Sequence, residues 1–204
     1  MANRPSVNAL TNADIASRIR RPWEDMSTIV DRIKNWTKDG ALAFRGKKHP
    51  GTGSKRRYDP EAIIDAVILT ALTDAGLAAV RVGNFQGVDR QTVLGLGRQG
   101  AAAVFDPARA NEKVYLVIAG SPRASATTTY VAYAAPAKLP EIDLSKPTPL
   151  QSPASTKTTE HVLVPPDAVW SVVLHLNRIF ESLRSVITVT QEGGVVKVEF
   201  IKGG

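Results

Sequence analysis

The chain has 204 residues, of which 43% are hydrophobic and 22% charged, and it carries a formal net charge of +7 and no cysteine. This size holds one full domain or two small ones, and the lack of cysteine excludes disulfides, thiolate metal sites and cysteine nucleophiles. No apolar run reaches the roughly 20 residues that cross a bilayer, and residues 1–10 have no apolar signal core, so we expect a cytoplasmic protein without a membrane partner. The three histidines lie far apart, so we expect neither a metal site nor a cofactor.

The positive charge is concentrated near the N-terminus. Residues 1–58 contain 13 Lys and Arg against 5 Asp and Glu, a net of +8, whereas residues 59–204 contain 13 against 14, a net of −1. A basic region this localised attracts a polyanion, and double-stranded DNA is the expected partner. The alternative is a solvated basic surface with no specific partner.

Two helices are predicted first. Thr11 or Asn12 is the N-cap of a helix over residues 13–20, which Pro22 ends. Trp23 then either packs on the following turn or lies near DNA. The next helix is capped by Ser27 or Thr28 and ends at Gly40, and helical spacing places an apolar stripe on it at Ile29, Val30, Ile33 and Trp36.

A basic segment follows, over residues 45–58, with the sequence RGKKHPGTGSKRRY. Its glycines, proline and six Lys and Arg predict a β-hairpin with a flexible tip. Asp59 as N-cap and Pro60 in the first turn then predict a third helix, which Gly76 ends. Its apolar face consists of Ile63, Ile64, Val67, Ile68, Ala71 and Leu72.

The C-terminal part is predicted to mix helices and strands. We expect a helix over residues 89–104, strands over 114–119 and 127–134, and a linker or mobile loop over 136–158. A short strand over 161–164 precedes a helix that opens at residue 165 and carries an apolar stripe over 169–187. Strands over 188–190 and 195–201 form a hairpin around Glu192-Gly193-Gly194.

Three motifs occur in order in the first third of the chain. They are Asp14-Ile15-Ala16, then Lys34-Asn35-Trp36-Thr37 before Gly40-Ala41-Leu42, then Arg56-Arg57-Tyr58 before the third helix. In this order and spacing, residues 10–78 resemble the winged-helix DNA-binding domain of the MerR family. The turn at residues 20–26 is longer than is usual there, Asn35 replaces a common aromatic residue, and no sustained heptad pattern follows Gly76.

The resemblance implies site-specific binding to double-stranded DNA, usually as a homodimer, with Lys34, Arg56 and Tyr58 on the phosphate backbone. The chemistry of the second helix agrees, because Lys and Arg neutralise phosphates while Asn, Arg and Lys can also contact base edges. The hairpin then acts as a wing along the backbone. The candidate DNA-binding residues are Thr28, Arg32, Lys34, Asn35, Lys38, Arg45, Lys47, Lys48, Lys55, Arg56, Arg57 and Tyr58.

The sequence therefore predicts an α+β fold, with a winged helix-turn-helix domain over residues 1–78 and a small α+β C-terminal domain. The latter divides into a strand and helix part over 79–135, the linker, and a helix with a hairpin over 159–204. It is expected to dimerise or to bind a protein partner or a small-molecule effector. We expect a transcriptional regulator; the alternative is an architectural, recombination or DNA-packaging accessory factor that recruits a partner protein to DNA. No nucleophile elbow, phosphate loop or dinucleotide motif is present, so we do not expect an enzyme.

Overall fold

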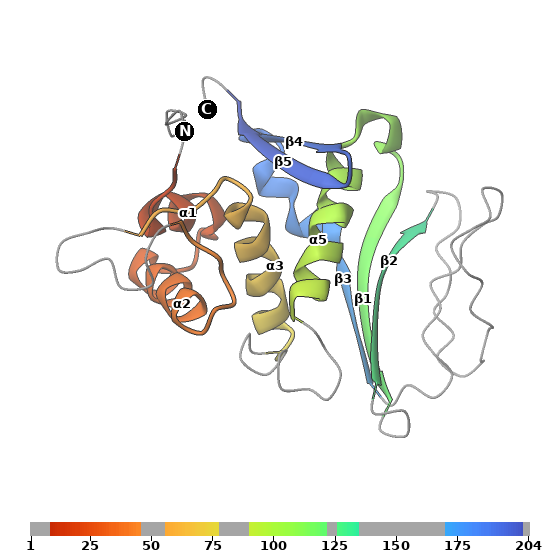
Figure 1. Ribbon diagram of the computed structural model, residues 1–204, viewed down its shortest axis with the longest axis horizontal. Coiled ribbons are helices and arrows are strands. Elements are labelled where there is room, and N and C mark those ends of the chain that lie inside the picture. Colours follow the sequence, from red (N-terminus) through yellow and green to blue (C-terminus); the bar gives the residue numbers. More distant parts are fainter. Residues whose placement is uncertain (1–8, 46–55, 78–89, 122–125, 135–169, 202–204) are drawn as a thin grey trace.

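The computed structural model describes residues 9–45, 56–77, 90–121, 126–134 and 170–201, which form an α+β fold. Helix α3 lies between the α1–α2 pair on one side and α5 on the other (Figure 1). A three-stranded sheet follows behind α5, and a two-stranded hairpin crosses the end of α5 (Figure 1). None of the helices in these ranges combines the length and apolarity needed to span a bilayer.

The first two helices are confirmed. α1 spans Asn12–Ile19 and begins with a capping box, in which the Thr11 side chain accepts from the Asp14 amide and the Asp14 carboxylate accepts from the Thr11 amide. α2 spans Met26–Lys38, and Gly40 follows it with a φ of 70°. Its N-cap is Asp25 rather than Ser27 or Thr28, because the Asp25 carboxylate accepts from both of their amides.

The third helix, α3, spans Ala62–Asp74 and is the most buried element of the described chain. It begins later than predicted, because residues 59–61 form a turn and the Asp59 side chain pairs with Arg45 instead of capping the helix. Every residue from Ala62 to Leu72 is buried, so α3 is a central helix and not an amphipathic one on the surface.

The predicted helix and strands before residue 135 are confirmed. α5 spans Arg90–Phe105 and is followed by a 3₁₀ turn over Pro107–Arg109. β1 (Lys113–Ser121) pairs antiparallel with β2 (Ala126–Ala134), as the predicted hairpin requires. The predicted linker over 136–158 and the short strand over 161–164 lie outside the described residues.

The long helix predicted from residue 165 is wrong. Within the described residues the segment begins with a strand, β3 (Trp170–His175), which pairs antiparallel with β1 and completes the sheet order β2-β1-β3. Only short turns follow, α6 (Leu176–Ile179) and the 3₁₀ helix η2 (Glu181–Leu183). The run WSVVLH is rich in aromatic and β-branched residues, and the free edge of β1 gives it a pairing partner.

The last predicted hairpin is confirmed as β4 (Ile187–Glu192) and β5 (Val195–Phe200). Gly193 and Gly194 connect the strands with φ of 57° and 80°, which a primed two-residue turn requires. The buried face of the hairpin packs on α5, and η2 approaches α1.

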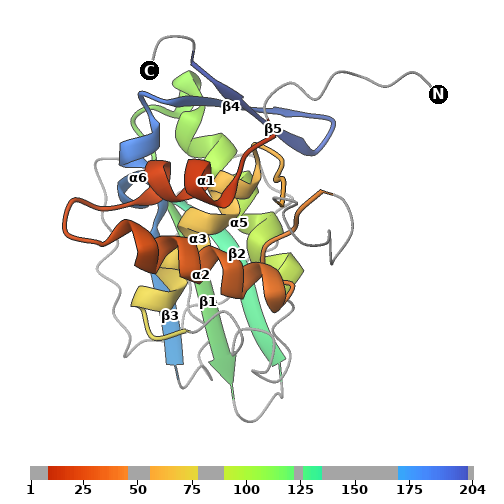
Figure 2. The same cartoon turned by 90° about the vertical axis from the view of Figure 1, so that its left-hand side faces the viewer.

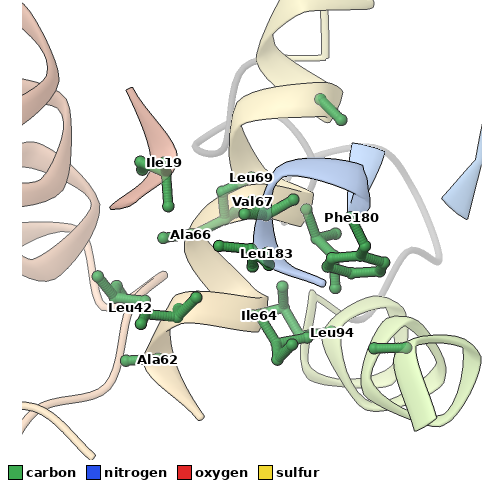
Figure 3. Close-up of a cluster of buried hydrophobic side chains, with 14 of the residues drawn as sticks. Ile19, Leu42, Ala62, Ile64, Ala66, Val67, Leu69, Leu94, Phe180 and Leu183 are labelled. Atoms are coloured by element: carbon green, nitrogen blue, oxygen red, sulfur yellow. The ribbon is translucent and has the colours of Figure 1, made fainter. Parts of the chain in front are cut away.

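One hydrophobic core runs through both halves of the chain. Figure 3 shows Ile19 and Leu42 on one side of α3, and Leu94, Phe180 and Leu183 on the other. A domain boundary at residue 78 stays a prediction, but it would divide residues that share a single core. The N-terminal helices are therefore supported by the C-terminal half.

Candidate nucleic-acid interface

α2 presents one polar face to the outside. It lies with α1 on the side of the molecule that faces the viewer in Figure 2. Its inner face buries Ile29, Ile33, Trp36 and Thr37. The side chains that recur at helical spacing on the opposite face form the exposed stripe of α2, which consists of Thr28, Asp31, Lys34, Asn35 and Lys38.

The cations of this face differ in what they contact. Lys34 Nζ lies 2.8 Å from a carboxylate oxygen of Asp31, and Arg32 Nη1 lies 3.0 Å from one of Glu24. Arg32 is half-buried at the edge of the stripe, so it is less available than predicted. Lys38 is exposed and makes no ion pair within the described residues, so it is the cation of α2 that can meet a phosphate at the least cost.

The base of the predicted hairpin is present. Leu10 pairs with Tyr58 and Arg45 pairs with Arg57, both antiparallel. The Arg45 amide donates to the Arg57 carbonyl oxygen at 2.6 Å, and the Leu10 and Tyr58 amides each donate to the carbonyl of the other at 2.9 Å. We call residues 44–45 and 56–58 the hairpin base; the tip, with Lys47, Lys48 and Lys55, lies outside the described residues.

The arginines of the hairpin base are held in different ways. Arg45 pairs with the carboxylate of Asp59. The hydrogen bond to Asp59, and after it the negative charge of Asp59, raise the pKa of the Arg45 guanidinium. Arg56 lies over the ring of Phe44, 5.4 Å from its centroid. Arg57 is exposed and donates to the Ala9 carbonyl oxygen at 3.4 Å. Neither Arg56 nor Arg57 forms an ion pair within the described residues, although the charge of Arg57 acts on the carboxylate of Asp14.

Tyr58 packs in the interior of the molecule. Its side chain is 0% exposed, so in this structure it cannot contact a phosphate. Burial raises the pKa of its phenol, and the hydroxyl lies 2.8 Å from Oγ1 of Thr37. Thr37 was not among the predicted residues. A threonine on the buried stripe of α2 is the signal that could have found it, because a buried hydroxyl needs a partner.

The charge of the described N-terminal part is balanced. Residues 9–45 and 56–77 contain 9 Lys and Arg and 9 Asp and Glu. The net charge of +8 over residues 1–58 is thus offset by the acidic residues of α3 and its approach, and the surplus belongs to Arg4, Lys47, Lys48 and Lys55. The described N-terminal part therefore has no excess of positive charge, and attraction of an anion depends on where its free cations lie.

The structure also shows what Trp23 and His175 contact. Trp23 is 76% exposed in the turn between α1 and α2, with the Arg21 guanidinium 5.8 Å from its ring, so it does not pack into the turn. His175 stacks on Tyr115 at 4.9 Å between ring centroids, and burial lowers its pKa. No group of three or more metal-ligating side chains occurs in the ranges that the structure describes.

Comparisons of the chain with protein-family models, with curated proteins and with solved structures find no match.

Proposed function

We propose that residues 9–77 form a winged helix-turn-helix head that binds double-stranded DNA sequence-specifically, with α2 as the reading helix. The observation that carries the proposal is the exposed stripe of α2 next to the basic hairpin base, joined to it by the Thr37–Tyr58 contact. α1 packs across α2 as the bracing helix of such a unit does. The resemblance of this region to the MerR family supports the same reading.

The geometry gives each residue a role. A helix of 13 residues is roughly 20 Å long, and the major groove, about 12 Å wide, admits one helix. With the stripe in the groove, Asn35 can contact adenine with both amide atoms, and Lys38 and Lys34 can contact phosphates or guanine. Arg56 and Arg57 then lie at the flanking backbone, with the lysines of residues 46–55 continuing from them in sequence.

We propose first that the protein is a transcriptional regulator and that it has no enzymatic activity. The accessory-factor alternative has one observation in its favour. α3 ends at Asp74, Gly76 follows it with a φ of 81°, and α5 is partly buried in the common core, so the described residues contain no protruding helix on which two heads could dimerise. We propose that a homodimer uses another surface. We also propose that the C-terminal half binds a protein partner or a small-molecule effector.

Selection from a random pool of duplexes by the full chain tests the proposal. The wild type should enrich a defined motif, and inverted repeats of it would indicate a homodimer. Asn35→Ala, which changes the stripe, should lose the preference at one position of the motif, whereas Lys197→Ala on the distant hairpin should keep the whole motif. Recovery of unrelated sequences with retained binding would favour the accessory factor, and no recovery at low salt would refute DNA binding.

A further inference from the structure

Thr37 of α2 and Tyr58 of the hairpin base share a buried hydroxyl contact. The two oxygens are 2.8 Å apart, and the residues are 4% and 0% exposed. Within the described residues, this is the side-chain hydrogen bond that joins α2 to the hairpin base. Because both groups are shielded from water, neither can exchange this partner for solvent without opening the structure.

The direction of the hydrogen bonds follows from the number of protons. Thr37 Oγ1 lies 2.7 Å from the Ile33 carbonyl oxygen, which can only accept, so the single threonine proton is donated there. The Tyr58 hydroxyl therefore donates to Thr37 Oγ1. A chain of donors thus runs from Tyr58 through Thr37 to the backbone of α2.

The same two residues adjoin the free cations of the interface. Lys38 follows Thr37 directly, and Arg57 precedes Tyr58. The Tyr58 backbone is also fixed, since its amide and carbonyl pair with Leu10. A hydrogen bond between the two side chains therefore sets the spacing between a cation of the helix and the cations of the hairpin.

We propose that Thr37 and Tyr58 are positioning residues, which hold the hairpin base against α2 so that Lys38, Arg56 and Arg57 match the phosphates on the two sides of one groove. This inference rests on the proposed function, and it reassigns Tyr58 from contacting DNA to arranging the residues that do. The protein has this arrangement before DNA arrives, which lowers the ordering cost of binding.

Two conservative variants and a matched control test the proposal in the full chain. Tyr58→Phe and Thr37→Val each remove one hydroxyl and keep the bulk of the side chain. Thr70→Val is the control, because Thr70 is also buried and donates to the carbonyl four residues earlier, at 2.8 Å, but does not reach the hairpin base. Affinity is measured on a duplex that the wild type selects, at a temperature at which circular dichroism shows all variants folded.

Each of the two variants should bind that duplex about fivefold more weakly, as the loss of one hydrogen bond allows. The double variant should lose no more than the weaker-binding single variant, because both changes break one link. Thr70→Val should bind like the wild type. If Tyr58→Phe weakens binding and Thr37→Val does not, Tyr58 contacts DNA directly and the proposal fails. The proposal also fails if the losses of the two single variants add in the double variant, if neither variant weakens binding, or if Thr70→Val weakens binding equally.

Amide hydrogen exchange of the free protein separates this inference from the proposed function. The Arg45 amide donates to the Arg57 carbonyl oxygen. It should exchange faster than in the wild type in Tyr58→Phe and Thr37→Val, and at the wild-type rate in Thr70→Val. Unchanged exchange in all three variants would overturn the link between α2 and the hairpin base, whether or not DNA binds. If exchange responds but the wild type binds no duplex, the link stands and the proposed function fails, and with it the DNA role of the two hydroxyls.

Discussion

Arg98 of α5 makes two hydrogen bonds to the buried carboxylate of Asp65 of α3. Nε of Arg98 lies 2.7 Å from Oδ1 of Asp65, and Nη2 reaches Oδ2. Asp65 is 2% exposed, and burial raises the pKa of its carboxyl even though the guanidinium acts in the opposite direction. This pair joins the N-terminal head to the C-terminal half, with the Asp65 side chain buried and the Arg98 side chain partly exposed.

Removing one partner of this pair should destabilise the whole chain. Arg98→Met leaves a buried carboxylate without compensation, and we expect a loss of about 3–5 kcal/mol in the free energy of unfolding, measured with urea. Because the folded pKa of Asp65 then lies above its unfolded value near 3.8, the variant should be least impaired in acid and should lose stability as the pH rises through the folded pKa. Asp65→Leu/Arg98→Met should recover much of the loss, and a single variant within about 0.5 kcal/mol of the wild type would show that the pair is dispensable.

The glycines of α5 should respond differently to alanine. A Cβ on Gly100 would lie 2.2 Å from Cδ1 of Leu176, and one on Gly97 would lie 2.3 Å from Cδ1 of Ile68, whereas one on Gly95 would meet nothing within 4 Å. Gly95→Ala should therefore stabilise the helix by up to about 1 kcal/mol, and the other two should cost about 1–3 kcal/mol by overpacking. Thermal unfolding of the three variants checks this order, and equal melting temperatures would contradict the close helix packing.

The charges of the exposed stripe should act unequally on DNA binding. Lys38→Ala should weaken binding to all sequences and reduce the slope of log affinity against log salt by about 0.9, because no carboxylate of the described ranges pairs with Lys38. Lys34→Ala should change the slope less, since Asp31 already compensates this lysine, and Asp31→Asn should tighten binding. Fluorescence anisotropy across a salt series measures all three, and a stronger effect of Lys34 than of Lys38 would refute this ranking.

Asn35 should affect specificity and not salt dependence. Asn35→Ala should weaken discrimination at one base pair by roughly 1–3 kcal/mol while the salt slope stays that of the wild type. Competition between the selected duplex and its single-base variants measures this effect. A uniform loss across all competitors would mean that Asn35 does not read a base.

The capping box of α1 should give a pH-dependent contribution to stability. The hydrogen bonds from the Thr11 side chain and backbone lower the pKa of Asp14. A lowered folded pKa contributes stability above the unfolded value near 3.8, and that contribution is lost as the pH falls through the folded pKa. Asp14→Asn should thus cost about 1 kcal/mol near neutral pH and progressively less in acid, and a constant difference from about pH 6 to pH 3 would contradict this.

Local signals predicted the elements whose structure is decided locally. Gly40 and Gly76 follow their helices at positive φ, and Gly193-Gly194 makes the turn of the last hairpin, as glycine there indicates. The spacing of apolar residues was sufficient for α2 and its exposed stripe. The N-cap of α2 was misplaced because Asp25, which competes with Ser27 and Thr28, is the stronger acceptor.

The errors arose where distant residues decide the structure. The apolar stripe over 169–187 fits a helix, but the edge of β1, some fifty residues earlier, recruits Trp170–His175 as a strand. The position of Tyr58 in its motif predicts a phosphate contact, but its side chain is buried in the core and its hydroxyl hydrogen-bonds Thr37. The net charge of +8 over residues 1–58 likewise stops just before Asp59, whose carboxylate pairs with Arg45.

Chemical-shift mapping by NMR tests the DNA-binding surface most directly. The full isotope-labelled chain is titrated with the duplex it selects, and backbone amide shifts are followed residue by residue. We predict that the largest changes fall on the stripe and hairpin base, at Thr28, Lys34, Asn35, Lys38, Arg45, Arg56 and Arg57, with little change in β4 and β5. Changes confined to the C-terminal hairpin, or none at saturating duplex in low salt, would contradict the proposal that α2 and the hairpin base bind DNA.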